Sequence, residues 1–357
     1  MWKAITYTPE RLSEMLEMAQ EYYGSENDIA NREFILHQYF GNPQGDAFID
    51  LAWDEENSKL AGQYVVWPMK FRVMGKEIPC VNSLNTLTRA SYRGQGIFTG
   101  LAEKTYEHAA REGRAFCYGA PNPNSYPGFL KKLSFSDLGR MPLYLRPLCP
   151  SAMVREFMNS VPVSAAARPF DFFFSVRPIK KQNGLEIVRI TADHLELADR
   201  LWAEVKDKYP IMNVRDSSFL RFRYLDMPKR RYFPYLLLLN GRPVALSIGR
   251  MMEVAGMQCG MLADFLFARG CGSQAGVLLR FMLRLMQNQG ASMVGSLMLA
   301  HTEEAALLRA NGFFRCPQRM EPQPFPLILR TFDKTLDSTG IMDLKNWFFC
   351  MGDYDVV

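Results

Sequence analysis

The sequence predicts a mixed α/β protein built from two tandem domains of the same kind. The chain has 357 residues, more than a single typical core accommodates. Two long segments repeat one order of apolar strand patterns and amphipathic helix patterns. In each segment an antiparallel run of strands precedes a strand, helix and strand unit, which favours a sheet with one parallel pair.

The first copy of the repeat begins with an aromatic helical pattern closed by proline, at 31–43. An apolar strand pair, a second hairpin arm, a glycine-containing loop with a helix, a strand and a last helix follow it. We expect these elements at 47–54, 59–71, 80–88, 93–113, 115–121 and 127–135.

The second copy has the same elements in the same order, at 216–228, 235–240, 242–252, 259–267, 272–290, 292–300 and 304–314. Two unrelated α/β units with common spacing are the alternative, but agreement of six elements in order favours a duplication. The expected domains are therefore 1–150 and 186–332. A connector rich in Pro, Ala and Phe lies between them at 151–185, and a tail at 333–357 packs on the domains.

The stretch YRGQGIFTGLAEK, from Tyr92 to Lys104, places two glycines and an arginine where a helix is expected to begin. A helix N-terminus carries unpaired N–H groups and a partial positive charge, so it attracts anions. Gly94 and Gly96 let the backbone turn and a ligand approach closely, and Arg93 adds a planar cation suited to phosphate. The pattern predicts pyrophosphate binding, although it is neither a Walker loop nor a complete G-x-G-x-x-G fingerprint.

This loop resembles the acyl-CoA loop of the GNAT superfamily of N-acetyltransferases, which follows Q/R-x-x-G-x-G/A. The chain reads Arg93, Gly94, Gln95, Gly96, Ile97 and Phe98, with Phe98 in place of a small residue. The resemblance implies that N–H groups of Gln95, Gly96, Ile97, Phe98 and Thr99 hold the CoA pyrophosphate. It also implies that the backbone of Leu87, Thr88 and Arg89 pairs with the pantetheine arm.

The segment PNPNSYPGFLKKLSF, Pro121 to Phe135, extends the resemblance, which covers residues 31 to about 145. Asn124 is similar to the family's Asn that bonds pantetheine. Leu130 stands where the family often has the tyrosine that protonates the leaving thiolate, and Tyr126 is a nearby substitute.

In the second copy only 305–313 resembles the family closely, and Ser273 stands where the loop arginine belongs. We therefore expect a degenerate second copy that does not bind CoA. As a whole, the chain resembles bacterial tandem-GNAT proteins of cell-surface polysaccharide and natural-product gene sets.

Acyl transfer to an amine needs a proton acceptor, so carboxylates on strands near the crevice are candidates. Asp264 lies inside an apolar strand, where it is either catalytic or paired with an arginine or a backbone N–H. Asp353 and Asp355 lie in the tail, and a solvated C-terminus is the alternative. Asn85 and His37 are candidates for the acceptor side, although strand hydrogen bonding and simple packing explain them equally.

Composition limits the other classes of function. A net charge of +5 permits an anionic ligand but does not indicate nucleic acid, and the basic run 229–231 has no interleaved aromatics. No apolar run approaches the roughly 18 residues of a membrane helix, and the N-terminus does not read as a secretory signal. Seven scattered cysteines without a CxxC pair favour a reduced, cytoplasmic setting, and four distant histidines give no zinc spacing.

The sequence thus predicts an acyl-CoA-dependent N-acyltransferase, with acetyl-CoA the expected donor and no metal. The acceptor would be an amine of a small molecule or sugar, attacking the thioester directly. Two alternatives stay open: a Fem-like aminoacyl transferase, which should not need the Arg93 loop, and a CoA-binding or sensing module without turnover. Oligomeric state is not predicted.

Overall fold

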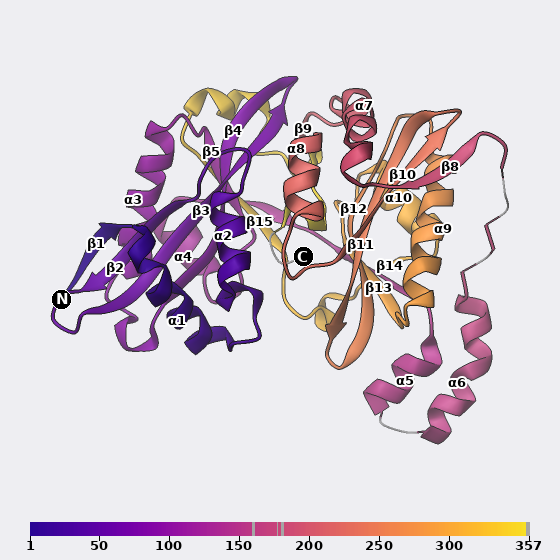
Figure 1. The fold of residues 1–357 in the computed structure, drawn as a ribbon, viewed down its shortest axis with the longest axis horizontal. Coiled ribbons are helices and arrows are strands. Elements are labelled where there is room, and N and C mark those ends of the chain that lie inside the picture. The colour runs from indigo at the N-terminus through magenta and orange to yellow at the C-terminus, as the bar shows by residue number, and fades with distance from the viewer. Residues whose placement is uncertain (159–160, 177, 180–181, 355–357) are drawn as a thin grey trace. The chain divides into compact units, whose positions relative to one another are not determined.

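The structure is a computed structural model that describes residues 1–158, 161–176, 178–179 and 182–354. The chain forms two compact units, each with its own mixed sheet, as the sequence predicted (Figure 1). The first unit comprises Met1–Arg140, Asp226–Lys229 and Gln323–Asn346. The second comprises Met141–Leu225, Arg230–Pro322 and Trp347–Val357.

The sheet of the first unit has the strand order β1-β2-β3-β4-β5-β15-β6. Every neighbouring pair in it is antiparallel except β4 with β5, which is parallel. The strands are β1 (Trp2–Thr6), β2 (Phe48–Asp54), β3 (Lys59–Val73), β4 (Lys76–Thr88), β5 (Phe116–Gly119), β15 (Pro326–Thr331) and β6 (Ser136–Arg140). The predicted antiparallel run with a single parallel pair is confirmed.

Helices of the first unit are α1 (Leu12–Tyr23), α2 (Arg32–Phe40), α3 (Ile97–Arg111) and α4 (Tyr126–Lys132). Apolar residues of α3 recur at helical spacing, so one face of the helix is buried on the sheet. Leu101, Ala102 and Tyr106 belong to a core cluster that also contains Tyr64 and Val66 of β3. This packing fixes the position of the N-terminus of α3 on the sheet.

The second unit repeats this plan with the strand order β14-β7-β13-β12-β11-β10-β8, in which only β12 with β13 is parallel. The strands are β14 (Phe314–Arg315), β7 (Leu143–Pro147), β13 (Met293–Leu297), β12 (Met257–Phe267), β11 (Arg242–Val254), β10 (Tyr232–Leu239) and β8 (Leu185–Arg189). A short parallel pair joins β9 (Ile211–Asn213) to β16 (Trp347–Phe348). The helices are α5 (Pro150–Met158), α6 (Val161–Phe174), α7 (Leu195–Val205), α8 (Ser217–Leu220), α9 (Gly272–Asn288) and α10 (Glu303–Ala310), and a π-helical turn follows α8 at Arg221–Leu225.

Each sheet contains one strand encoded far from the rest of its copy. β15, from the end of the second copy, lies between β5 and β6 of the first sheet, and β7, from the end of the first copy, lies between β13 and β14 of the second. The observed units are therefore discontinuous, unlike the expected segments 1–150 and 186–332. Strand exchange of this kind leaves no local sequence signal, because β-pairing is set by tertiary contacts.

The expected connector and the expected tail both contain regular secondary structure. The connector contains α5 and α6, and the tail contributes residues 333–346 to the first unit and β16 to the second. Asp355, one of the tail candidates, lies outside the described residues. Whether 1–150 and 186–332 behave as separate domains stays a prediction.

Candidate functional site

A crevice opens where the parallel strands of the first unit diverge. β4 and β5 pair only at Val81 with Cys117 and at Asn82 with Tyr118. Beyond these residues the end of β4, the start of α3 and the loop before α4 enclose a cavity of ≈ 690 Å³. That volume is in the range of small-molecule and cofactor sites. A ligand-sized crevice thus lies at the carboxyl ends of the parallel pair.

The loop before α3 has the backbone form that two glycines permit. Gly94 and Gly96 have φ values of 79° and 77°, which side chains disfavour, and a Cβ built on either would meet no atom within 4 Å. Within the described part of the chain, no hydrogen bond engages the backbone N–H groups from Gly94 to Thr99. These donors lie at the positive end of α3, so together they can bind an anion.

Aromatic side chains hold this loop in place. Trp2 donates its indole N–H to the carbonyl of Gln95 at 3.1 Å. The ring of Phe98 lies 5.3 Å from that of Phe129 on α4. A Cβ on Gly128 would come within 2.9 Å of the Phe98 ring. The bulky residue that departs from the loop pattern is therefore accommodated by a glycine on α4.

The crevice is lined by hydroxyl and amide groups, three cations and several apolar atoms. The lining residues are Tyr22, Thr86, Leu87, Thr88, Arg93, Phe98, Asn122, Asn124, Ser125, Pro127, Gly128, Lys131 and Lys132. Of the predicted cofactor-binding residues, Leu87, Thr88, Arg93, Phe98 and Asn124 belong to this set. Gly94, Gln95, Gly96, Ile97 and Thr99 form the adjoining loop and first turn of α3.

Arg89 is placed differently from its predicted neighbours. Its side chain is 6% exposed and pairs with Glu21 of α1, and its Nε donates to the carbonyl of Leu60 at 2.7 Å. Its backbone N–H donates to the carbonyl of Ala61 at 2.9 Å. These donors are therefore already engaged within the first unit, and Arg89 does not line the crevice in the described part of the chain.

Two lysines of α4 were missed at the level of sequence. Lys131 and Lys132 line the crevice together with Arg93, and the described lining contains no carboxylate. Three cations without a counter-charge favour an anionic ligand. The only available signal was the basic pair in the segment after β5, and such pairs usually lie on a solvated surface.

Asn122 is another crevice residue for which the sequence predicted no role. Its Oδ1 accepts hydrogen bonds from the N–H groups of Asn124 at 3.0 Å and Ser125 at 3.1 Å. This side-chain turn fixes the loop that presents Asn124 to the crevice. Asn in the sequence PNPNS could have signalled the turn.

A bulge in β4 contains Asn85, one of the predicted acceptor-side residues. The β3–β4 register shifts beside Gln63, and Asn85 takes a φ of 48°, a left-handed value for which Asn is well suited. The Asn85 amide donates to Gln38 Oε1 at 2.8 Å and to the Tyr39 hydroxyl at 3.0 Å, both on α2. His37 lies half buried on the same helix. In the described part of the chain neither Asn85 nor His37 lines the crevice.

Tyr126, the predicted proton donor, starts α4 between two crevice residues. Its hydroxyl donates to Asp137 Oδ2 at 2.7 Å. This hydrogen bond raises the pKa of Tyr126 to about 12, and partial burial adds to the effect. The hydroxyl is thus a weak acid that is already directed at a carboxylate, and its catalytic role stays a prediction.

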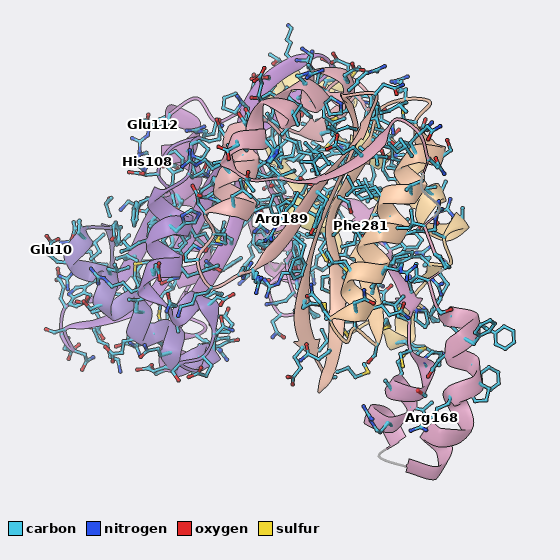
Figure 2. The ribbon with its side chains drawn as sticks, turned by 45° about the vertical axis from the view of Figure 1, so that its right-hand side comes forward. Glu10, His108, Glu112, Arg168, Arg189 and Phe281 are labelled. Carbon is cyan, nitrogen blue, oxygen red and sulfur yellow. The ribbon has the colours of Figure 1, made fainter. Side chains whose placement is uncertain are left out.

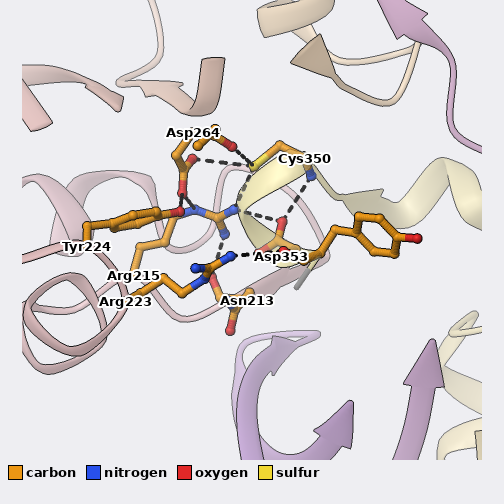
Figure 3. Close-up of polar contacts among 9 residues, drawn as sticks. Asn213, Arg215, Arg223, Tyr224, Asp264, Cys350 and Asp353 are labelled. Carbon is orange, nitrogen blue, oxygen red and sulfur yellow. Dashed lines mark hydrogen bonds and ion pairs between the residues drawn. The ribbon is translucent and has the colours of Figure 1, made fainter. Parts of the chain in front are cut away.

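The two predicted carboxylates, Asp264 and Asp353, lie together in the second unit (Figure 3). Arg215 joins them, with its Nε 2.9 Å from Asp264 Oδ2 and its Nη2 2.8 Å from Asp353 Oδ2. All three side chains are at most 1% exposed. Burial raises the pKa of Asp264, although the Arg215 charge opposes the shift. A buried, charge-paired cluster favours a structural role for both carboxylates.

In the second unit, the chain's own C-terminal segment occupies the place that corresponds to the crevice. β12 and β13 pair from Cys259 to Met261 and then diverge. Beyond that point the backbone of Cys350 forms an isolated antiparallel β-bridge with Met298, which follows β13. Its Sγ lies 3.4 Å from the carbonyl oxygen of Ala263 on β12. The tail therefore fills the divergence that in the first unit is open.

The comparisons with known proteins agree with this geometry. Residues 4–136 match the family model described as acetyltransferase (GNAT) domain, so this segment is similar to the acetyltransferase domains of that family. No curated protein matches the sequence.

Solved structures similar to the whole chain carry the same fold. A protein of unknown function from Enterococcus faecalis V583, named a probable N-acyltransferase, has a TM-score of 0.64 at 13% identity, covering 93% of this chain and 73% of that one. A GCN5-related N-acetyltransferase from Anabaena variabilis ATCC 29413 has a TM-score of 0.63 at 12% identity, covering 92% and 72%. The N-myristoyltransferase of Saccharomyces cerevisiae, solved with myristoyl-CoA, has a TM-score of 0.64 at 11% identity, covering 92% and 82%.

These matches span nearly the whole chain, so its architecture is a tandem GNAT-like fold. Among the described helices, none has the length and apolarity to cross a bilayer. The described His, Cys, Asp and Glu side chains form no cluster that could hold a metal ion.

Proposed function

We propose that the protein transfers an acyl group, in the simplest case acetyl, from acyl-CoA in the first-unit crevice to an amine of a small molecule or sugar. The observation that carries this proposal is the set of unengaged N–H groups from Gly94 to Thr99, which open onto a cation-lined crevice. Pyrophosphate is the anion that this combination suits.

Different crevice residues would bind different parts of a CoA thioester. The loop N–H groups and Arg93 would hold the pyrophosphate, and Lys131 and Lys132 would attract further phosphate charge. Among the described strands, none pairs with β4 past Asn82 on the crevice side, so peptide groups of Leu87 and Thr88 are available to an extended arm. Asn124 would supply an amide to the same arm from the opposite wall.

When bound, acyl-CoA supplies an activated carbonyl, and the chain's residues bind and orient it. Fixing donor and acceptor in one cleft provides much of the rate of such a reaction. The bulge at Asn85, held by α2, breaks the β3–β4 register just before the crevice residues Thr86 and Leu87, and so leaves backbone N–H groups near the crevice outside the regular ladder. One of these would stabilise the developing oxyanion. The loss of the amine proton to water fits a crevice lining that offers no carboxylate in the described residues.

That last feature also supports a second candidate, a module that binds acyl-CoA without turnover. No described lining residue is an Asp, Glu, His or Cys, and the Tyr126 hydroxyl is directed at Asp137. A sensing module needs the cradle but no proton donor or acceptor. Turnover of any amine separates the two candidates.

Calorimetric titration of acyl-CoA into the wild type and Gly96→Glu tests the proposal. The introduced carboxylate would add a negative charge where the pyrophosphate is proposed to bind, and we expect micromolar binding to be lost. Gly113→Glu is the matched control, because Gly113 also has a positive φ of 76° and an unobstructed Cβ position, at the other end of α3. Equal weakening in both variants, or no binding by the wild type, would refute the crevice assignment.

The same titration measures how many CoA molecules bind per chain and which acyl chain length of the donor binds best. One CoA per chain is expected, because the C-terminal segment fills the equivalent place in the second unit. Donors from acetyl-CoA to myristoyl-CoA should be compared, since the yeast structure holds the longer acyl chain. Release of the CoA thiol with a panel of amines and amino sugars then reports turnover.

A further inference from the structure

Phenylalanines are concentrated on the solvent side of α6, in the segment between the two copies. Phe170 is 56% exposed, and Phe172 and Phe173 are each 77% exposed. In the described part of the chain, Phe314 is the one other phenylalanine classed as exposed, at 47%. Surface apolar residues scattered singly are ordinary, whereas three large exposed apolar side chains within four residues form a patch of the kind that usually has a partner.

The neighbouring residues show that this exposure is selective. Phe174 is half buried, and the Arg146 guanidinium lies 5.9 Å from its ring and donates to its carbonyl at 3.3 Å. Val176 is buried. The end of α6 is therefore anchored in the second unit, and Phe172 and Phe173 point elsewhere although they are adjacent in sequence.

A cation, Arg168, lies beside the exposed rings. Arg168 is exposed one helical turn before Phe172 (Figure 2). Asp171 is the single acidic residue in α6, and it is occupied by α5, accepting the Ser151 N–H at 2.9 Å and the Ser151 hydroxyl at 2.6 Å. Taken as sequence alone, without regard to where its side chains lie, the segment 146–181 has six basic and two acidic residues, a net charge of +4 in a chain of +5.

We propose that α6 is a peripheral membrane anchor that docks on an anionic lipid surface. Exposed aromatics beside cations on a helix suit the boundary between headgroups and acyl chains, and anionic headgroups complement the local charge. A neutral or basic protein surface would not match these cations. The helix lies on the bilayer and does not cross it, in keeping with the absence of a spanning helix among those described.

Flotation of the full-length protein with lipid vesicles tests the proposal. Vesicles of phosphatidylcholine alone are compared with vesicles that also contain phosphatidylglycerol, at low and high salt. We expect binding to the anionic vesicles that weakens with salt. Phe172→Ser with Phe173→Ser should weaken it by about tenfold per ring, and Arg168→Glu by roughly 30-fold on anionic vesicles.

Phe314→Ser is the matched control, since it also removes an exposed ring from the second unit and should leave vesicle binding unchanged. Acyl-CoA titration of each variant shows that the fold is intact, because none of these residues lines the crevice. Failure of the wild type to float with anionic vesicles would overturn the anchor and leave the proposed activity untouched. A wild-type dimer that the Phe172 and Phe173 double variant converts to monomer would also overturn it, because a second copy would then cover α6.

Discussion

Replacing Arg215 with methionine should destabilise the second unit strongly. Arg215 is 1% exposed at its side chain and is paired with Asp264 at 2.9 Å and Asp353 at 2.8 Å. Arg215→Met removes the cation and leaves two buried carboxylates facing the same vacated position. Breaking a buried ion pair from one side costs about 3–5 kcal/mol. For a unit of 150–250 residues this corresponds to a Tm lower by roughly 6–20 °C.

Thermal unfolding followed by circular dichroism measures this effect. Arg242→Met is the control, because Arg242 pairs with Glu204 on the surface of the same unit at 55% exposure, where such a pair contributes about 1 kcal/mol or less. Asp264→Asn should cost less than Arg215→Met, since the Arg215–Asp353 pair survives it. Equal Tm values for the Arg215→Met and Arg242→Met variants would refute the structural role of the cluster.

The pH dependence of this deficit has a defined sign. Burial raises the pKa of Asp264 above its ordinary value, so the folded state holds that proton more tightly than the unfolded state does. The resulting stabilisation is fully present below the ordinary value of about 4 and is lost as the pH rises through the raised pKa. Without Arg215 the Asp264 carboxylate protonates more readily, so the Tm deficit of Arg215→Met should shrink as the pH falls from neutral toward about 4.

Two further substitutions test the first unit. Tyr126→Phe should lower acyl transfer less than about tenfold, because the hydroxyl already donates to Asp137 and its pKa of about 12 makes it a weak acid; a loss of about 100-fold or more in kcat at unchanged KM would assign it the role of general acid. Asp54→Asn should lower the Tm at neutral pH, because Asp54 accepts hydrogen bonds from Asn57 and Tyr92, each at 2.7 Å, and these hold its pKa at about 2. That contribution is present above the ordinary carboxyl pKa and is lost as the pH falls through about 2, so a Tm gap that widened with acid would contradict it.

Local patterns in the sequence predicted the backbone form of the loop before α3. Gly94 and Gly96 indicated a positive φ, and the helical pattern after them placed the N-terminus of α3, because both depend on residues close together in the chain. The repeat of strand and helix patterns was likewise sufficient for a tandem fold with one parallel pair in each sheet. The resemblance to the GNAT loop then linked the cradle to acyl-CoA, and residues 4–136 match that family.

Side-chain partners were decided by the tertiary structure alone. Asp264 and Asp353 were both noticed as unusual carboxylates, yet their common partner Arg215 lies 49 and 138 residues away along the chain, and no local pattern links the three. Arg89 lies one residue beyond Thr88, but the strand ends there and its side chain packs against α1. Two adjacent residues therefore have different surroundings: Thr88 lines the crevice, and Arg89 forms a largely buried ion pair.

The exchange of β7 and β15 between the sheets also depended on tertiary structure. A strand pattern predicts that a segment will pair but does not specify its partner, because the ladder is formed by backbone groups common to all residues. The C-terminal segment fills the second divergence for the same reason, through Cys350 contacts that no motif encodes. The sequence by itself thus determined the kind of fold and the backbone form of the loop before α3, since both follow from local backbone preferences. Only packing in three dimensions decided which carboxylates are paired, which strands are exchanged and which of the two crevices is open.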